Sequence, residues 1–175
     1  LALRGAAAYI AGLELPEPDA AQVDAEKARV FAPLLRGEAF DGLRALEMEE
    51  RLQRLMDEYA GGTSQFYRTN EERLDYALKH LAMLRSQVQF LKAGDLHDLM
   101  AVHEVIDRID VAEVLCHHLR FRKETRWQGW QTRSDYPEVD PAYDCHVESR
   151  KNLATGEIET FTRPYEQLVS GDRYK

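Results

Sequence analysis

The sequence contains little cysteine, no long hydrophobic run and no recognisable leader segment. Its 175 residues include only Cys116 and Cys145, too few for the disulfide framework that small secreted domains use. No apolar run approaches the roughly 20 residues that a membrane-spanning helix requires, and no charged segment followed by an apolar one indicates a secretory signal. We therefore expect a reduced, cytoplasmic protein without a membrane span.

Basic charge is also in the minority. Lys and Arg number 23 and Asp and Glu number 31, which gives a formal net charge of −8. A general binder of nucleic acid needs a basic face, so nucleic acid is not expected as a partner. The densest basic run also contains Trp127 and Trp130, and aromatic side chains among basic ones can stack bases. Ion pairing with the acidic remainder of the chain, or with a partner, is the favoured interpretation of this run, which comprises Arg120, Arg122, Lys123, Arg126 and Arg133.

The sequence lacks the fingerprints of nucleotide, metal and nucleophilic sites. It contains no Gly-x-x-x-x-Gly-Lys, no Gly-x-Gly, no Glu-x-x-His and no His-Glu-x-x-His. Cys116 falls on an apolar stripe, where cysteine is usually a small inert hydrophobe. Cys145 and His146 are neighbours in a predicted strand and so point to opposite faces. Potential metal ligands gather on one predicted helix, where we interpret them as solvated or interface residues: His97, His103, Glu104, Asp107, Glu113, His117 and His118.

Hydrophobic periodicity predicts a protein that is mainly helical. Gly-containing turns separate five segments with helical spacing, at residues 1–10, about 19–36, 43–59, 71–91 and 95–123. Pro33 is expected to kink or end the second segment early. Thr69 or Asn70 is the expected cap of the fourth, with Glu72 available for a capping box. We expect an all-α fold in which residues 19–123 form an antiparallel bundle of about four helices.

The character of the chain changes after Glu124. An irregular stretch rich in aromatic residues and proline follows, from Trp127 to Tyr143. The next residues alternate as strands do, with 145–150 and 158–162 flanking a turn at 152–156, which predicts a β-hairpin. We expect three parts: an N-terminal remnant (1–12), the bundle (19–123) and a tail with a short C-terminal hairpin (124–175).

Several segments of the sequence resemble one known protein family. They surround the helix ends and the start of the tail: 52–62 (Leu-Gln-Arg-Leu-Met-Asp-Glu-Tyr-Ala-Gly-Gly), 67–71 (Tyr-Arg-Thr-Asn-Glu), 95–100, 121–127 (Phe-Arg-Lys-Glu-Thr-Arg-Trp), 133–137 (Arg-Ser-Asp-Tyr-Pro) and 163–165. Together they resemble the C-terminal helical domain of the fumarate reductase/succinate dehydrogenase flavoprotein family. Within that family they look most like the adenylylsulfate reductase flavoprotein (alpha) subunits. Gln128 departs from that pattern, which prefers Pro after the Trp.

The resemblance implies a structural role for four motif residues. Family members carry a Lys/Arg-Glu-Ser/Thr-Arg turn after the last bundle helix, then a basic residue and Asp-Tyr/Phe-Pro. The matching positions here are Glu124, Arg126, Arg133 and Asp135. We expect hydrogen-bonded ion pairs at these positions, fixing the tail against a flavin domain. Buried ion pairs set geometry more reliably than they add stability.

The resemblance also implies that this chain is one part of a larger enzyme. Full-length members bind FAD in an N-terminal dinucleotide domain and transfer electrons between the flavin and a substrate. That domain is not in this sequence, so no catalytic, cofactor-binding or metal-binding residue is assigned, and the chain alone is expected to be inactive. The expected partners are its own flavin domain, of which residues 1–12 resemble the last helix, and an iron–sulfur subunit. The start at Leu1 without Met leads us to expect a processed product or an excised fragment.

Two other functions stay open at this stage. The first is a free-standing helical interaction module, an adaptor that uses the region of Trp127 and Trp130 as its contact surface. The second is a metal-dependent helical enzyme, which predicts stoichiometric iron or zinc.

Overall fold

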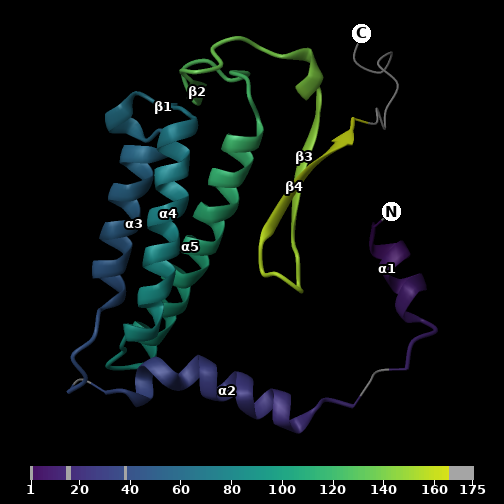
Figure 1. Cartoon of the computed structure of the whole chain (residues 1–175). Coiled ribbons are helices and arrows are strands. Elements are labelled where there is room, and N and C mark those ends of the chain that lie inside the picture. The colour runs from purple at the N-terminus through teal and green to yellow at the C-terminus, as the bar shows by residue number, and fades with distance from the viewer. Residues whose placement is uncertain (1, 15–16, 38, 166–175) are drawn as a thin grey trace.

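The core is a set of three long helices packed side by side. The computed structural model describes residues 2–14, 17–37 and 39–165. Helices α3 (Ala45–Tyr59), α4 (Glu71–Gln87) and α5 (Leu96–Phe121) run antiparallel to their sequence neighbours (Figure 1). Their facing stripes are fully buried and include Met48, Leu52, Leu74, Leu81, Val102, Val105, Ile109 and Cys116. The structure thus confirms helices in the three segments predicted at 43–59, 71–91 and 95–123 and buries Cys116 in the apolar stripe on which the sequence placed it.

Helix ends follow local capping chemistry. The Asn70 side chain accepts a hydrogen bond from Arg73 N at 2.9 Å and the Asp95 side chain accepts one from Asp98 N at 2.8 Å. These bonds satisfy backbone N–H groups that the first helical turn leaves free. Of the two caps expected for α4, the structure therefore uses Asn70. A short 3₁₀ turn, Val88–Phe90, extends α4 toward α5.

Helix α2 (Ala20–Leu35) lies across one end of the bundle rather than alongside it (Figure 1). Two bonds hold its C-terminal part: His103 Nε2 lies 2.9 Å from Val30 O, and Ala93 N donates to Pro33 O at 3.0 Å. Pro33 does not end the helix early, because it lies in the last turn. Because α2 lies across the end, the packed bundle holds three long helices instead of about four. The apolar side chain of Phe31 on α2 stays 42% exposed.

Helix α1 (Ala2–Ile10) confirms the first predicted helix but leaves its apolar side chains in solvent. Leu3 is 87% exposed and Ile10 is 62% exposed. Since this helix buries no hydrophobic face within the described chain, its stability must depend on other contacts. The interpretation of residues 1–12 as part of a flavin-domain helix remains a prediction.

Residues of the tail take part in two small sheets. Strands β3 (Cys145–Lys151) and β4 (Ile158–Pro164) form the predicted antiparallel hairpin, with Cys145 opposite Pro164 and Lys151 opposite Ile158. The hairpin lies beside α5 (Figure 1). The second sheet was not predicted: β1 (Arg68–Thr69) pairs in parallel with β2 (Thr132–Arg133), so part of the stretch expected to be irregular is ordered. Short 3₁₀ turns occupy Thr63–Gln65 and Pro141–Tyr143.

None of the helices in the described ranges combines the length and the apolar character that crossing a membrane requires.

The core assignment predicts a large stability difference between two positions on α5. Ile109 is 0% exposed and Val111 is 66% exposed. We expect Ile109→Ala to lower the free energy of unfolding by about 2–5 kcal/mol, because it leaves a cavity. The matched control Val111→Ala should change it by about 0.5 kcal/mol or less. Urea denaturation monitored by circular dichroism measures both, and equal effects would contradict this packing.

Candidate functional site

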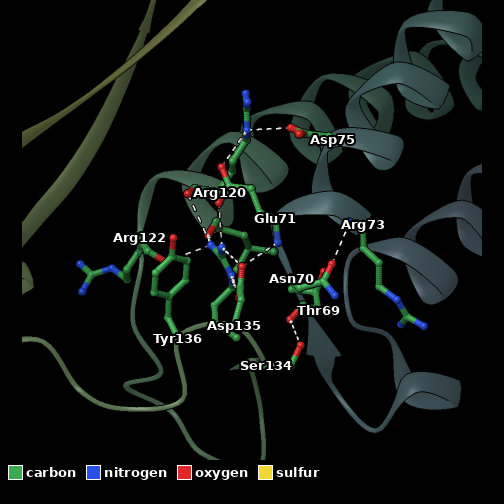
Figure 2. A network of polar contacts seen from close by, with 12 residues as sticks. Thr69, Asn70, Glu71, Arg73, Asp75, Arg120, Arg122, Ser134, Asp135 and Tyr136 are labelled. Atoms are coloured by element: carbon green, nitrogen blue, oxygen red, sulfur yellow. Dashed lines mark hydrogen bonds and ion pairs between the residues drawn. The ribbon is translucent and has the colours of Figure 1, made fainter.

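Arg133 is a buried cation at the end of α5. Only 2% of its side chain is exposed. Its guanidinium donates two parallel hydrogen bonds to Asp135, from Nε at 2.9 Å and from Nη2 at 2.8 Å. Nη2 also donates to Glu71 Oε2 at 2.9 Å. Figure 2 labels both carboxylate residues. A bidentate pair with a second carboxylate neutralises the buried cation and fixes its plane.

The remaining donor of Arg133 reaches the end of α5. Nη1 donates to the backbone carbonyls of Leu119, Arg120 and Arg122, the last at 3.2 Å. These are carbonyls that a helix leaves without partners at its C-terminus. A cation here also suits the negative end of the helix dipole. Arg133 therefore acts as a cap that binds the tail to α5.

Asp135 makes the complementary contact at the start of α4. Its Oδ2 accepts a hydrogen bond from Glu71 N at 2.8 Å, where the helix dipole favours a negative charge. The single pair of Arg133 and Asp135 thus joins the C-terminal end of one helix to the N-terminal end of its neighbour. Tyr136 covers the pair from outside, with the Arg133 Cζ atom 5.0 Å from the ring centre.

Glu124 organises a second network a few residues away. Its side chain is 0% exposed and accepts hydrogen bonds from Arg122, from Arg126 Nε at 2.9 Å and from Asp140 N at 2.9 Å. Arg122 also donates to the carbonyls of Tyr143 and Cys145 at 3.0 and 3.2 Å. This network fixes the tail at the point where the hairpin begins.

The surroundings of Glu124 and Asp135 lower the pKa of both carboxyl groups. Burial opposes ionisation of Glu124, but the bonds from Arg126, Asp140 N and Arg122 outweigh it and lower the pKa of its carboxyl. Burial likewise opposes ionisation of Asp135, and the bonds from Arg133 and from Glu71 N lower its pKa nevertheless. The charged state is thus built into the folded structure.

Threonine side chains join these networks to the backbone. Thr125 Oγ1 donates to Tyr136 O at 2.8 Å and accepts from Arg133 N at 2.9 Å. Thr69, which was expected as a possible helix cap, instead donates from Oγ1 to Tyr59 O at 2.7 Å. Thr125 and Glu71 were not singled out, and their only sequence signal was that they lie inside the resembling segments.

Several of the other candidates lie apart from the motif or already have partners. His118 is different: it lines a pocket with Arg122 and Glu124, and its buried Nε2 has no hydrogen-bond partner in the described part of the chain. His103 contacts α2, Glu113 pairs with Arg85 at 3.0 Å, and Glu104 lies 3.5 Å from Arg108. Within the described ranges, no three His, Cys, Asp or Glu side chains are arranged to hold a metal ion. Burial raises the pKa of the Cys116 thiol to about 12, so this group is not a thiolate at neutral pH.

The arrangement supports structure rather than chemistry. The polar atoms of Arg133 and Glu124 are bonded within the chain, and neither network places a nucleophile beside a base. The fold of the described residues also does not fit a dinucleotide site. Such a site requires parallel strands joined through a helix that begins at a Gly-rich turn. The parallel strands in the described part of the chain are β1 and β2, with two residues each, and no Gly-x-Gly occurs in the sequence. The residues of the two networks are therefore not assigned a contact with flavin.

Comparison with known proteins agrees with this architecture. Residues 49–167 match the model of the family described as fumarate reductase flavoprotein C-term. This chain belongs to that family. The match contains both networks, α4, α5 and most of α3, so the family resemblance recognised in the sequence is confirmed.

Individual relatives show how the chain compares with longer proteins. It is 32% identical over 123 residues to the adenylylsulfate reductase subunit alpha of Megalodesulfovibrio gigas, covering 70% of this chain and 18% of that protein. It matches the structure of adenylylsulfate reductase from Archaeoglobus fulgidus with a TM-score of 0.90 and 35% identity, over 97% of this chain and 28% of that one. A Mycobacterium smegmatis Sdh1 complex, at 24% identity and a TM-score of 0.70, shares the fold. The chain thus spans less than a third of these relatives.

The geometry predicts that Arg133 matters far more for stability than an exposed arginine in a similar pair. Arg133→Met should lower the free energy of unfolding by about 3–5 kcal/mol, because it leaves Asp135 without its cation and the last carbonyls of α5 without their donor. Arg150 pairs with Glu159 at 2.8 Å on the hairpin but is 73% exposed, so Arg150→Met should cost about 1 kcal/mol or less. Chemical denaturation tests this, and similar losses in the two variants would rule out the buried cap.

The lowered pKa values also predict acid sensitivity. A carboxyl whose pKa is lower in the folded than in the unfolded chain stabilises the fold above its unfolded pKa. That contribution is lost as the pH falls below about 4 and passes through the lowered pKa. Asp135→Asn should therefore reduce the slope of stability against pH in this range. Denaturant titrations at several pH values measure the slope, and an unchanged slope in Asp135→Asn would contradict the assignment.

Proposed function

We propose that the chain is the C-terminal helical domain of an FAD-dependent oxidoreductase of the adenylylsulfate reductase type. The observation that carries the proposal is the TM-score of 0.90 at 35% identity over 97% of the chain with the Archaeoglobus fulgidus enzyme. In the parent protein, electrons pass between the flavin and adenylylsulfate in a domain outside this chain. The chain itself supplies no catalytic residue and is inactive alone.

The role of the domain is to hold a fixed surface against the flavin domain. Helix α1 and the N-terminal half of α2 bury no hydrophobic face within the described chain. The exposed face of α2 borders an open groove of about 670 Å³, which includes Val23, Val30 and Phe31. Exposed apolar surface of this kind is typical of a contact with another domain. Arg133 and Glu124 keep the tail and the helix ends in the geometry that this contact needs.

The tail provides the expected surface for a second subunit. The hairpin has no fully buried residue, and two strands alone are marginally stable in water. An iron–sulfur subunit in the cytoplasm is the partner that the family likeness favours. An adaptor function is the second candidate, supported by Trp127 and Trp130, whose side chains are 70% and 72% exposed. Large exposed aromatic side chains often anchor protein interfaces.

Measuring FAD binding distinguishes the oxidoreductase domain from the adaptor. The purified 175-residue chain should be folded and colourless, and fluorescence titration with FAD should show no saturable binding. The parent protein with its upstream sequence should copurify with one equivalent of flavin and reduce adenylylsulfate in the presence of an electron donor. A parent with Arg133→Met should lose flavin and activity on mild heating before a parent with Arg150→Met does.

Tight stoichiometric binding of FAD by the isolated chain would overturn the assignment of the flavin to another domain. A parent protein that carries no flavin would overturn the oxidoreductase and favour the adaptor.

A further inference from the structure

A small cavity of about 260 Å³ lies beside the start of α4, separate from the buried networks described above. Its wall contains two guanidinium groups and no carboxylate, and consists of Gln65, Arg68, Thr69, Asn70, Arg73 and Ser134. Figure 2 shows Asn70 and Arg73 at the first turn of α4, with Thr69 and Ser134 beside them. The wall comes from two parts of the chain, residues 65–73 and Ser134, and the parallel pairing of β1 with β2 brings them together.

The two arginines of this cavity lack the carboxylate partners that other arginines of the protein have. Arg120, Arg122, Arg126 and Arg133 all pair with carboxylates. Arg73, in contrast, donates to two neutral acceptors, Gln65 Oε1 at 2.7 Å and Glu58 O at 3.4 Å. For Arg68, the described residues provide neither a hydrogen bond nor an ion pair to its side chain.

Neutral donors complete the wall, while the helix start is already occupied. The Asn70 side-chain oxygen accepts from Arg73 N, which leaves its amide N–H₂ without a partner in the described structure. Glu71 N is taken by Asp135. The donors available to a ligand are therefore the side chains of Arg68, Arg73 and Asn70, not the backbone amides of α4.

The backbone holds Arg68 at this position. Phe66 and Tyr67 have φ angles of +53° and +58°, in the left-handed region that residues other than glycine seldom adopt. Pairing with β2 fixes this turn, since Thr132 N donates to Tyr67 O at 2.8 Å and Ser134 N donates to Thr69 O at 2.9 Å. Arg68 enters the cavity wall directly after the turn.

We propose that this cavity binds a small oxyanion of the phosphate class. Two guanidinium groups and an amide form an array of donors around one anion, and arginine matches the oxygens of phosphate through paired N–H groups. The volume suits one anionic group with its remaining water, because sites for larger organic ligands usually measure about 300–1,000 Å³.

The test is a titration of the 175-residue chain with inorganic phosphate at constant ionic strength, followed by amide chemical shifts. We expect saturable binding in the millimolar range, with shifts confined to residues 65–73 and 132–134. Sodium chloride at matched ionic strength should produce no such shifts. Arg68→Gln should weaken binding about tenfold and the double variant with Arg73→Gln should abolish it. Arg54→Gln, which changes an exposed arginine of α3 outside the cavity wall, should leave binding unchanged.

Arg68→Gln keeps the test independent of folding, because the Arg68 side chain makes no bond that the fold requires. Shifts that rise linearly without saturation would overturn the proposal. Equal weakening by Arg68→Gln and Arg54→Gln would also overturn it, since that result indicates a general effect of net charge.

Discussion

The ends of α4 and α5 are held together by one buried cation. Arg133 donates to the last carbonyls of α5, while its partner Asp135 accepts from the first amide of α4. Removing water from a guanidinium costs several kcal/mol, so this position is tolerated only because two carboxylates and three carbonyls surround it. The directions of those bonds determine where β2 can lie, and β2 in turn fixes β1 and the turn before it. The position of β2 at this end of the bundle therefore follows from a single side chain.

The second network extends the same principle to the hairpin. Glu124 is buried at the point where the chain leaves α5, and it collects bonds from two arginines and a backbone amide. Arg122 continues to the carbonyls at the start of β3. The hairpin, which has no fully buried residue, is thus attached through charged groups at the point where it begins. This gives the tail a defined orientation at a modest gain in stability, as is usual for buried ion pairs.

Part of this structure follows from local sequence and part does not. The stripes of α3, α4 and α5, the caps Asn70 and Asp95, and the hairpin at 145–164 were predictable, because periodicity and capping act within a few residues. The crossing of α2 was not, since it depends on His103 and Ala93, which lie about 60 to 75 residues from their bonding partners. The β1–β2 pair was missed because two-residue strands carry no alternation pattern.

The motif residues show the same division. The family pattern singled out Glu124, Arg126, Arg133 and Asp135, and the structure places them in two adjacent networks. Periodicity alone would have left Arg133 on the surface, because arginine is seldom fully buried. The participation of Glu71 follows from its position at the first turn of α4, beside Asp135. That proximity is a tertiary contact, which no local pattern encodes.

The central claim is that this chain is the C-terminal part of a longer flavoprotein. Reading the gene upstream of Leu1 tests it most directly. The account predicts an open reading frame that continues for several hundred codons and contains a Gly-x-Gly-x-x-Gly turn between a strand and a helix, as in a dinucleotide-binding domain. A start codon immediately before Leu1 would contradict it.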